Sequence, residues 1–313
     1  MTPQPQQHCE QHLIIDVDRK YRESKRRGGA FPNLAAMKYS SLQKSKGNIT
    51  GFDIKHPDKV FITCVFTKNR LEAIKECCDT FDIPRYFGGS GLTTDWDLIP
   101  EIEFQRPDYD LYPSTYSLGF TTRGCIRDCG FCIVREKEGK FRRHQHIEEF
   151  HDFRFKSCKL LDNNILADKE WFFENTNWAI DNKVNLNITQ GMDIRLVTPE
   201  IADQLKKIKF VDQQIRFAWD DPYIIRRVEE GIQILKDAGI NTRRNVSFYI
   251  LAGYNGDKTA YQRCKILRDL RCNSFVMMYS ETQELKNLAR WANRRQLYWS
   301  MNFDDYKKVK ANG

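Results

Sequence analysis

Apolar positions recur with two different periods along residues 11–93, and the two periods alternate. Residues 13–15 and 60–66 are short apolar runs of the kind found in buried strands. Asn33 precedes a helical pattern and is placed to cap it. A second helix is expected to present one apolar face, made of Leu71, Ile74, Cys78 and Phe81. This alternation predicts a Rossmann-like domain built on a parallel sheet.

Residues 94–113 interrupt the pattern. They hold three prolines and many acidic residues without any clear period, and they are expected to form a linker.

From residue 114 to residue 300 the alternation of strand and helix patterns becomes regular. The clearest helix follows Asp221 and Pro222, a capping residue and a helix-starting proline, and stops at Gly239. Six apolar runs are expected to be strands: 116–121, 157–162, 184–190, 214–219, 246–252 and 274–279. The fold class predicted is α/β, a Rossmann-like domain followed by a partial (β/α)6 barrel over residues 114–300. Residues 301–313 are expected to be a tail.

The composition narrows the class of protein. A chain of 313 residues that is 41% hydrophobic can fill a real core. It has no apolar run long enough for a membrane span and no signal-peptide stretch, so a cytoplasmic protein is expected. The formal charge of +8 favours anionic partners such as nucleic acid. Ten cysteines in such a protein are expected to serve packing, metal ligation or catalysis, because the cytosol keeps thiols reduced.

Three of the cysteines form a motif directly after the first strand of the second domain. Cys125, Cys129 and Cys132 are separated by three and then two residues, so their thiolates can converge on one metal centre. Structural zinc normally needs four ligands, and no second pair lies at finger spacing. Three ligands on a [4Fe–4S] cluster would leave one iron open for an exogenous molecule. A cluster or zinc that borrows a distant fourth cysteine, and three packed thiols, stay open as alternatives.

The motif resembles the signature of the radical S-adenosylmethionine (SAM) superfamily. The likeness rests on Thr-Arg-Gly-Cys…Cys-Gly-Phe-Cys-Ile-Val, with Phe131 before the last cysteine, and on Lys137-Glu138-Gly139. This motif resembles the motif of the branch with an N-terminal cobalamin-binding-like domain. It also resembles that of methylthiotransferases that modify transfer RNA. The resemblance implies that a [4Fe–4S] cluster reductively cleaves SAM, and that the resulting 5′-deoxyadenosyl radical takes a hydrogen from a substrate.

The resemblance also implies a shell of residues around SAM at the strand ends. Acceptors after the second strand would suit its amino group, arginines its carboxylate, and a tyrosine and a glycine on the fifth strand would approach adenine. Asp220 is expected either to touch the ribose or, preferably, to cap the following helix. The expected cofactor-binding residues are Phe131, Asp162, Asn163, Asn164, Gln190, Asp193, Arg195, Arg216, Tyr249 and Gly253.

The sequence departs from both branches. Asp53-Ile-Lys-His56-Pro-Asp58 does not match the cobalt-ligating Asp-x-His-x-x-Gly motif, so cobalamin is not expected to bind through a histidine, and the first domain is expected to be a scaffold or a lid. The N-terminal cysteines of methylthiotransferases and their C-terminal RNA-binding barrel are not matched either.

Four of the remaining cysteines and the last aromatic residues are expected to pack. Cys64, Cys77, Cys78 and Cys264 lie in apolar patterns and are assigned to the core. A basic and aromatic group near the C-terminus could stack on bases, but closing the barrel is the favoured role: Trp291, Arg294, Arg295, Tyr298 and Trp299.

Family analogy implies a one-electron donor such as flavodoxin or ferredoxin. The substrate stays open, with nucleic acid among the candidates. Two other functions stay open as well, a structural or electron-transfer iron–sulfur protein and a nucleic-acid-binding module.

Overall fold

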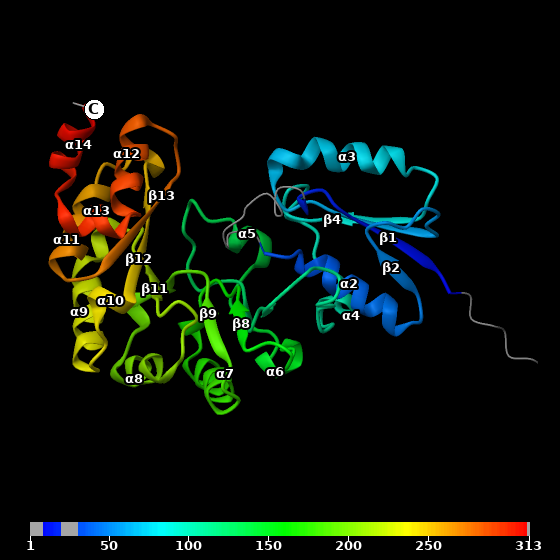
Figure 1. The fold of residues 1–313 in the computed structure, drawn as a ribbon, viewed down its shortest axis with the longest axis horizontal. Coiled ribbons are helices and arrows are strands. Elements are labelled where there is room, and N and C mark those ends of the chain that lie inside the picture. The colour runs from blue at the N-terminus through cyan, green and yellow to red at the C-terminus, as the bar shows by residue number, and fades with distance from the viewer. Residues whose placement is uncertain (1–8, 20–30, 312–313) are drawn as a thin grey trace, which may run out of the picture. The chain divides into compact units, whose positions relative to one another are not determined.

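The computed structural model describes residues 9–19 and 31–311, which form two compact units. The first unit comprises the described residues up to Gly119 together with 148–155, and the second comprises 120–147 and the described residues from Lys156 onward. Both units are mixed α/β structures with parallel sheets, as the alternation of patterns predicts (Figure 1). Within the described residues, no helix has the length and apolarity needed to cross a membrane.

The first unit is built on a four-stranded parallel sheet in the order β2-β1-β3-β4. Its strands are β1 (Gln11–Asp16), β2 (Ile49–Gly51), β3 (Lys59–Thr63) and β4 (Arg85–Gly88). The two faces are covered by α2 (Leu34–Ser45) and by α3 (Arg70–Asp79), which follows the short 3₁₀ helix η1 (Thr67–Asn69). Asn33 caps α2 as predicted, because its side chain accepts a hydrogen bond from the backbone amide of Ala36.

The apolar face predicted for α3 is wrong. Leu71 is 82% exposed and Phe81 is 74% exposed, and Ile74 and Cys78 also face solvent. The helix instead rests on Ala73 and Cys77, which pack against the apolar side chains of β1 and β3. Small side chains on the inner side let the helix lie close to the sheet, so the larger apolar residues are left outside.

Residues 94–113, expected to be a linker, contain structure in the first unit. They include α4 (Pro100–Glu103), and Tyr112 donates a 2.7 Å hydrogen bond to the buried carboxylate of Asp16. Tyr109 is buried and donates to the carbonyl of Phe150 at 2.7 Å. The unit also contains β5 (Ser117–Gly119) and most of α6 (Ile147–Phe150). Hydrogen bonds from tyrosines, and not apolar periodicity, hold this segment.

The second unit carries most of the expected strands. A four-stranded parallel sheet has the order β10-β11-β12-β13, and β8 pairs in parallel with β9. The strands are β8 (Ser157–Leu160), β9 (Asn185–Ile188), β10 (Met192–Asp193), β11 (Ile215–Ala218), β12 (Val246–Ala252) and β13 (Asn273–Met278). An antiparallel hairpin of β6 (Thr122–Arg123) and β7 (Arg142–Arg143), which the sequence did not suggest, frames the cysteine motif.

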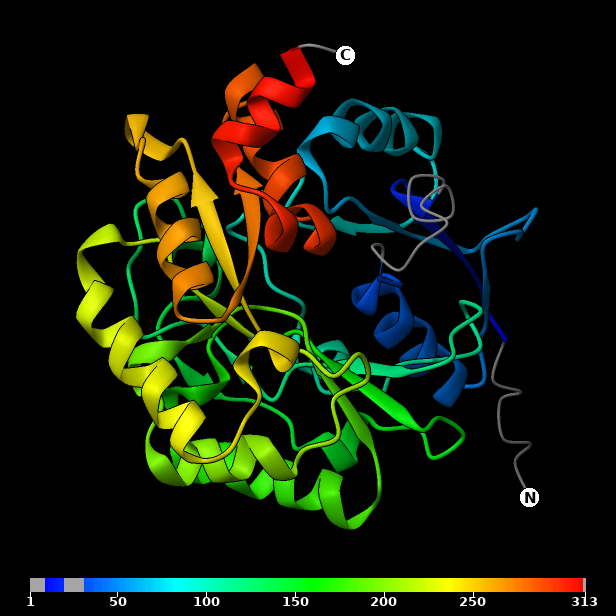
Figure 2. The same cartoon turned by 60° about the vertical axis from the view of Figure 1, so that its left-hand side comes forward.

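Helices cover one side of these strands (Figures 1 and 2). The larger ones are α7 (Lys169–Asp181), α8 (Pro199–Lys207), α9 (Ile225–Asp237) and α11 (Ala260–Asp269). The unit also contains short helices: α5 (Val134–Glu138), α10 (Thr242–Asn245), η2 (Ile165–Ala167), η3 (Ile194–Leu196), η4 (Pro222–Ile224) and η5 (Tyr254–Gly256). Helix α9 buries Val228, Ile232 and Leu235, and Gly239 follows it, as predicted, in the left-handed conformation. Asp221 caps η4, and the α-helix begins three residues after Pro222, at Ile225.

The chain ends in three helices, α12 (Gln283–Ala292), α13 (Arg295–Ser300) and α14 (Phe303–Ala311). Trp291 and Tyr298 are each 1% exposed. These two aromatic residues therefore pack in the core, as the favoured prediction says. Phe303 and Tyr306 are buried too, which places an ordered helix where a tail was expected. Apolar packing against α12 fixes this segment.

One buried carboxylate fixes the start of the hairpin that holds the cysteines. Asp162 follows β8 and is 1% exposed. It accepts hydrogen bonds from the backbone amides and hydroxyls of Thr121 and Thr122, with the two hydroxyl oxygens at 2.6 and 2.7 Å. Burial raises the pKa of Asp162, and these hydrogen bonds oppose that rise.

Replacing Asp162 by asparagine should destabilise the second unit. Asparagine removes the negative charge that strengthens these hydrogen bonds, and its nitrogen would face the amide of Thr121, which also donates to the second carboxylate oxygen at 3.2 Å. We expect a loss of about 2–4 kcal/mol in the free energy of unfolding. Denaturant unfolding followed by circular dichroism measures the change. The matched control is Asp203→Asn on the exposed side of α8, which should change stability by less than about 0.5 kcal/mol. Equal stabilities of the two variants would contradict this role.

Candidate functional site

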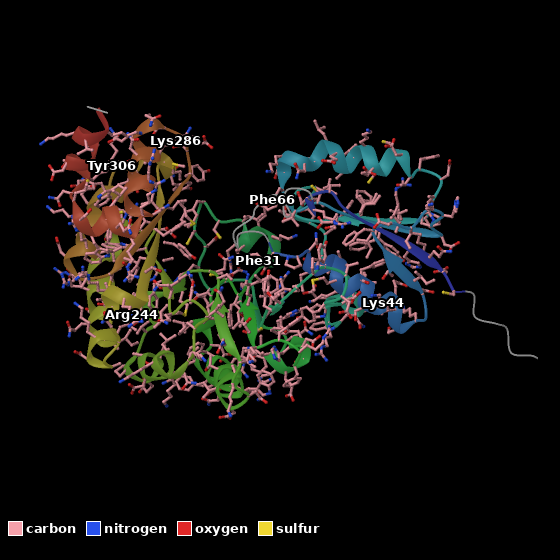
Figure 3. The ribbon with its side chains drawn as sticks, viewed as in Figure 1. Phe31, Lys44, Phe66, Arg244, Lys286 and Tyr306 are labelled. Carbon is pink, nitrogen blue, oxygen red and sulfur yellow. The ribbon has the colours of Figure 1, made fainter. Side chains whose placement is uncertain are left out.

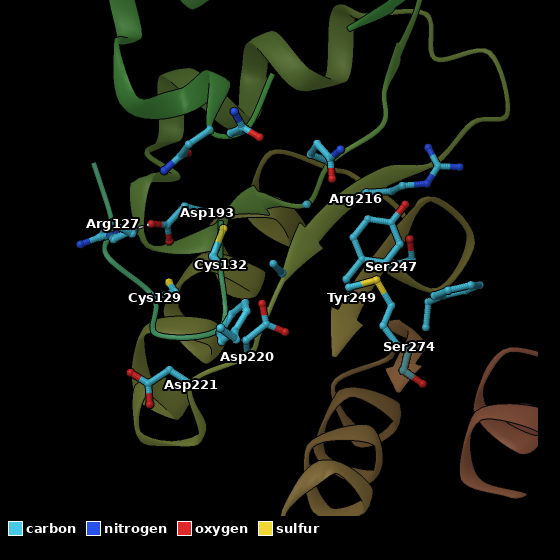
Figure 4. Close-up of a pocket in the computed structure, with 18 of the residues that line it drawn as sticks. Arg127, Cys129, Cys132, Asp193, Arg216, Asp220, Asp221, Ser247, Tyr249 and Ser274 are labelled. Atoms are coloured by element: carbon cyan, nitrogen blue, oxygen red, sulfur yellow. Dashed lines mark hydrogen bonds and ion pairs between the residues drawn. The ribbon is translucent and has the colours of Figure 1, made fainter. Parts of the chain in front are cut away.

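A large pocket lies within the second unit, with a volume of about 1280 Å³. One end is lined by the cysteine motif and the residues that follow β10 and β11, and the other by side chains of β11, β12 and β13. Figure 4 shows Cys129, Cys132 and Asp220 toward the first end and Arg216 and Tyr249 toward the second. Parallel strands often carry ligand sites at their carboxyl ends, and this pocket exceeds the size of a small-ligand site.

The cysteine motif forms a tight loop inside the β6–β7 hairpin. Gly124 has a φ of +70°, and a Cβ at this position would lie 2.2 Å from the carbonyl oxygen of Lys140, so only glycine fits. The amide of Cys132 donates to the carbonyl of Cys129 at 2.9 Å. All three cysteines are half-buried and line the pocket, so the structure brings them to one surface.

The donor chemistry of this loop fits an iron–sulfur cluster. The sulfur of Cys125 accepts a 3.3 Å hydrogen bond from the amide of Arg127, and the side-chain nitrogen of Asn164 lies 3.9 Å away. Such bonds to sulfur tune cluster potentials. No three His, Cys, Asp or Glu side chains in the described parts of the chain lie close enough to hold a single ion. A cluster does not require this, because each thiolate binds a different iron.

Burial raises the pKa of the Cys129 thiol. The neighbouring thiols of Cys132 and Cys125 raise it further, as does Asp220, while Arg195 lowers it. Three thiolates crowded together repel one another, and binding of a cationic metal centre would relieve this repulsion.

Glu138, at the end of α5, fastens the beginning of the cysteine loop. One of its carboxylate oxygens accepts from the amide of Gly124 at 2.9 Å and from the side chain of Asn163 at 2.8 Å. The guanidinium of Arg123 lies 3.5 Å from the other oxygen. Asn163 was expected to contact SAM; it lines the pocket, but its amide nitrogen is engaged by this carboxylate.

Asp193 fastens the middle of the loop. Asp193 is the last residue of β10 and caps the 3₁₀ helix η3. Its carboxylate accepts hydrogen bonds from Arg127 at 2.8 Å and from Arg195 at 2.7 and 3.0 Å. Burial opposes its ionisation, but the hydrogen bonds from the two arginines outweigh burial and hold the pKa of Asp193 below its usual value. The two guanidiniums and this carboxylate together carry a positive charge, and the carboxylates of Asp220 and Asp221 line the same pocket.

Asn164 has an unusual environment among the expected cofactor residues. It is 4% exposed and lines the pocket, and its side-chain oxygen is buried without a hydrogen-bond partner in the described structure. A buried carbonyl oxygen left in this state costs about 1–3 kcal/mol, and a bound donor would recover that loss. The oxygen is therefore an unpaired acceptor, and the nitrogen of the same amide group lies 3.9 Å from the sulfur of Cys125.

Asp220 is held at the same end of the pocket. Its carboxylate accepts from the amide of Leu251 at 2.7 Å, and burial raises its pKa. It does not cap the following helix, which was the preferred prediction, because Asp221 takes that role. Arg263, a buried residue of α11, donates to the carbonyls of Trp219, Asp220 and Leu251 and so ties the ends of β11 and β12 together.

The pocket collects most of the residues expected at the cofactor. Eight of them line it: Phe131, Asn163, Asn164, Gln190, Asp193, Arg195, Arg216 and Tyr249. Phe131 stands edge-on to Tyr254, with ring centres 5.4 Å apart. Tyr249 donates to the carbonyl of Thr189 at 3.2 Å, and Arg216 pairs with Asp212 at the end of the pocket away from the cysteines.

Two expected residues do not line the pocket. Asp162 is engaged with Thr121 and Thr122, as described above. Gly253 has a φ of +87°, and a Cβ there would collide with Leu285 and Ser280, so the glycine serves backbone packing. Sequence reasoning gave no role to Arg127, Glu138 or Tyr254. The first two lie inside the quoted motifs, but only the fold reveals their partners.

Most other cysteines pack as expected. Cys64 and Cys264 are buried, and burial raises the pKa of both thiols, to about 11 and about 12 respectively. Cys77 is half-buried against the core of the first unit, whereas Cys78, assigned to the core, is exposed. The exposed position follows from the rotation of α3 described above.

Comparison with known proteins finds a similarity over part of the chain. The chain is 27% identical over 145 residues to a ribosomal protein uS12 methylthiotransferase, RimO, of Ruegeria pomeroyi, and no protein-family model matches. The match covers 46% of this chain and 28% of the relative, so the chain spans less than a third of that protein's length. Methylthiotransferases are one of the groups that the cysteine motif resembles. The similarity therefore supports the radical SAM superfamily, and goes no further than that level.

Proposed function

We propose that this protein is a radical SAM enzyme, with the cluster on Cys125, Cys129 and Cys132 and SAM in the adjoining pocket. The observation that carries the proposal is the joining of three half-buried thiols with a vacant buried acceptor, the side-chain oxygen of Asn164, on one pocket wall. The strand order would be that of a partial (β/α)6 barrel. The cysteine pattern and the similarity to a methylthiotransferase point the same way.

The bound cofactors would supply the reactive chemistry: an electron from the cluster cleaves SAM to methionine and a 5′-deoxyadenosyl radical, which takes a hydrogen atom from the substrate. The electron would come from a small donor protein such as flavodoxin or ferredoxin. The protein's own contribution is to bind, orient and exclude water.

The residues near the cysteines are suited to the two charged groups of an amino acid. The oxygen of Asn164 would accept a hydrogen bond from the ammonium group of SAM. Arg195 and Arg127 share one carboxylate, Asp193, so part of their donor capacity stays available for a second carboxylate, that of SAM. A ligand held by both ends would be oriented against the cysteine loop.

The remaining pocket would be left for the substrate. Tyr249, Phe275 and Met277 form its apolar middle, and the rings of Tyr249 and Phe275 stand edge-on 5.7 Å apart. Polar side chains of Arg216, Ser247 and Asn273 lie in register on β11, β12 and β13. A substrate with an apolar body and a polar end would match the apolar middle and the polar end of the pocket.

The cluster is tested by reconstitution under anaerobic conditions. Wild type should take up about four irons per chain, whereas the triple variant Cys125→Ala, Cys129→Ala, Cys132→Ala should take up none, because it lacks the thiolates. The control variant Cys9→Ala, Cys77→Ala, Cys78→Ala should behave as wild type. Iron and sulfide analysis measures the content.

Electron paramagnetic resonance of the reduced cluster adds the decisive comparison. The spectrum should change when SAM is added, because SAM would bind the iron that lacks a protein thiolate. A cluster that forms with no such change would indicate a structural or electron-transfer protein, and would overturn the proposal.

Asn164→Leu should weaken SAM binding while leaving the cluster intact. The substitution keeps the branched shape and the number of heavy atoms but removes the acceptor for the ammonium group, so we expect at least a tenfold rise in the dissociation constant. Equilibrium binding of radiolabelled SAM to the cluster-loaded protein measures it, and iron content confirms that the cluster is retained. Unchanged affinity in a variant with full iron content would remove Asn164 from the site.

A further inference from the structure

Five exposed arginines gather where α10, the turn before β13 and the start of α13 meet. These residues, here called the arginine surface, are Arg243, Arg244, Arg271, Arg294 and Arg295. The guanidinium of Arg295 donates to the backbone carbonyl of Arg243. Arg243 and Arg271 both lie over the ring of Trp299, at 4.7 and 6.0 Å from its centre. Segments that are 50 residues apart in the sequence thus contribute to one positive surface (Arg244 is labelled in Figure 3).

The arginine surface lacks the carboxylates that accompany other exposed arginines. Arg143, Arg154 and Arg227 each form ion pairs with acidic side chains. None of the five arginines forms an ion pair with any residue that the structure describes. Positive charges collected without counter-charges repel one another, and a bound anion removes that cost.

Local stability does not account for arginine at these positions. Arg294 is the N-cap of α13 and makes no capping hydrogen bond, and Arg295 is the first residue of the helix. Positive charge at a helix N-terminus is unfavourable by about 0.3–1 kcal/mol, and Ser, Asp or Asn would cap better. Arg271 has a φ of +64°, a conformation that glycine or asparagine adopts more easily. Three of the five arginines therefore occupy sites where other residues would be more stabilising.

Trp299 holds part of the surface in a fixed geometry. Its indole nitrogen donates to the side chain of Asn273 at 2.9 Å, which fixes the ring. Guanidiniums stacked over the ring keep their N–H edges available, and these planar forks match phosphate oxygens. Arg243 and Arg271 thus lie over one fixed ring, with polar edges of the kind that bind phosphate.

We infer that the arginine surface binds the phosphate backbone of a polynucleotide. A single phosphate would need one or two guanidiniums, whereas five arginines on three segments match a chain of regularly spaced anions. The formal charge of +8 favours the same class of partner. This inference goes beyond the proposed function, and it does not depend on SAM chemistry.

Fluorescence anisotropy with the full chain tests the inference. The probes are labelled single-stranded RNA and DNA of about 20 nucleotides, long enough for a single site, titrated at several salt concentrations. The test variant is Arg294→Glu, Arg295→Glu, because glutamate at a helix N-terminus is stabilising and the fold should be kept. The matched control is Arg226→Glu, Arg227→Glu, which makes the same change of charge in the first turn of α9.

The inference predicts binding that weakens with salt, and a loss of at least tenfold in affinity for the test variant, with the control within about twofold of wild type. The slope of log affinity against log salt should fall by about two for the test variant, one for each lost phosphate contact. Equal weakening in both variants, absence of binding at low salt, or displacement of the probe by polyglutamate as readily as by unlabelled RNA would each overturn it. The last outcome would identify an acidic peptide as the partner.

Discussion

The loop that carries the three thiols leaves Ile126 and Ile133 largely exposed, so burial of apolar side chains contributes little to its position, and carboxylates hold it instead. Asp162 fixes the two threonines before the loop, Glu138 binds the amide of Gly124 at its start, and Asp193 holds Arg127 at its middle. Each carboxylate comes from a different element of the second unit. The position of the cysteines is therefore set by charge-assisted hydrogen bonds, which are directional and stronger than neutral ones.

The same interactions set the electrostatics of the pocket. Asp162 accepts hydrogen bonds from backbone amides and hydroxyls, so it stabilises the fold and offers no accessible acceptor to a ligand. Asp193 accepts hydrogen bonds from two arginines. Asn164 has an unpaired side-chain oxygen, and the nitrogen of the same amide group lies 3.9 Å from the sulfur of Cys125. One end of the pocket thus offers a positive group and an acceptor near the thiols, a combination that suits a zwitterionic ligand. The other end, around Arg216 and its partner Asp212, is polar but balanced in charge.

The sequence predicted the strands of the second unit well because apolar runs and turn residues are local signals. Each of the six expected runs overlaps a strand, although the first of these strands, β5, belongs to the first unit. The capping of α2 and the end of α9 were also correctly placed. The cysteine motif was visible from spacing alone. The sequence does not determine which face a helix turns toward the sheet or which residues a side chain contacts. Helix α3 rests on Ala73 and Cys77 and leaves Leu71 in solvent, because close approach to the sheet outweighed side-chain size.

The errors at the site also arise because hydrogen-bond partners cannot be read from the sequence. Asp162 and Asn164 both carry oxygens that could accept from an ammonium group, and only the fold distinguishes the engaged oxygen from the vacant one. Glu138 and Arg263 gave no signal of their roles, since their partners are backbone groups or lie far away in the sequence. The arginine surface was visible only as scattered basic residues until three segments met around Trp299.

The most direct test of the account is whether the reconstituted protein produces 5′-deoxyadenosine from SAM when reduced with dithionite. The account predicts 5′-deoxyadenosine from wild type, and none from the variant that lacks Cys125, Cys129 and Cys132. Chromatography with mass detection identifies the product, and cell extract supplies substrates that could increase turnover. Wild type with a complete cluster that yields no 5′-deoxyadenosine, even with extract present, would contradict the central claim.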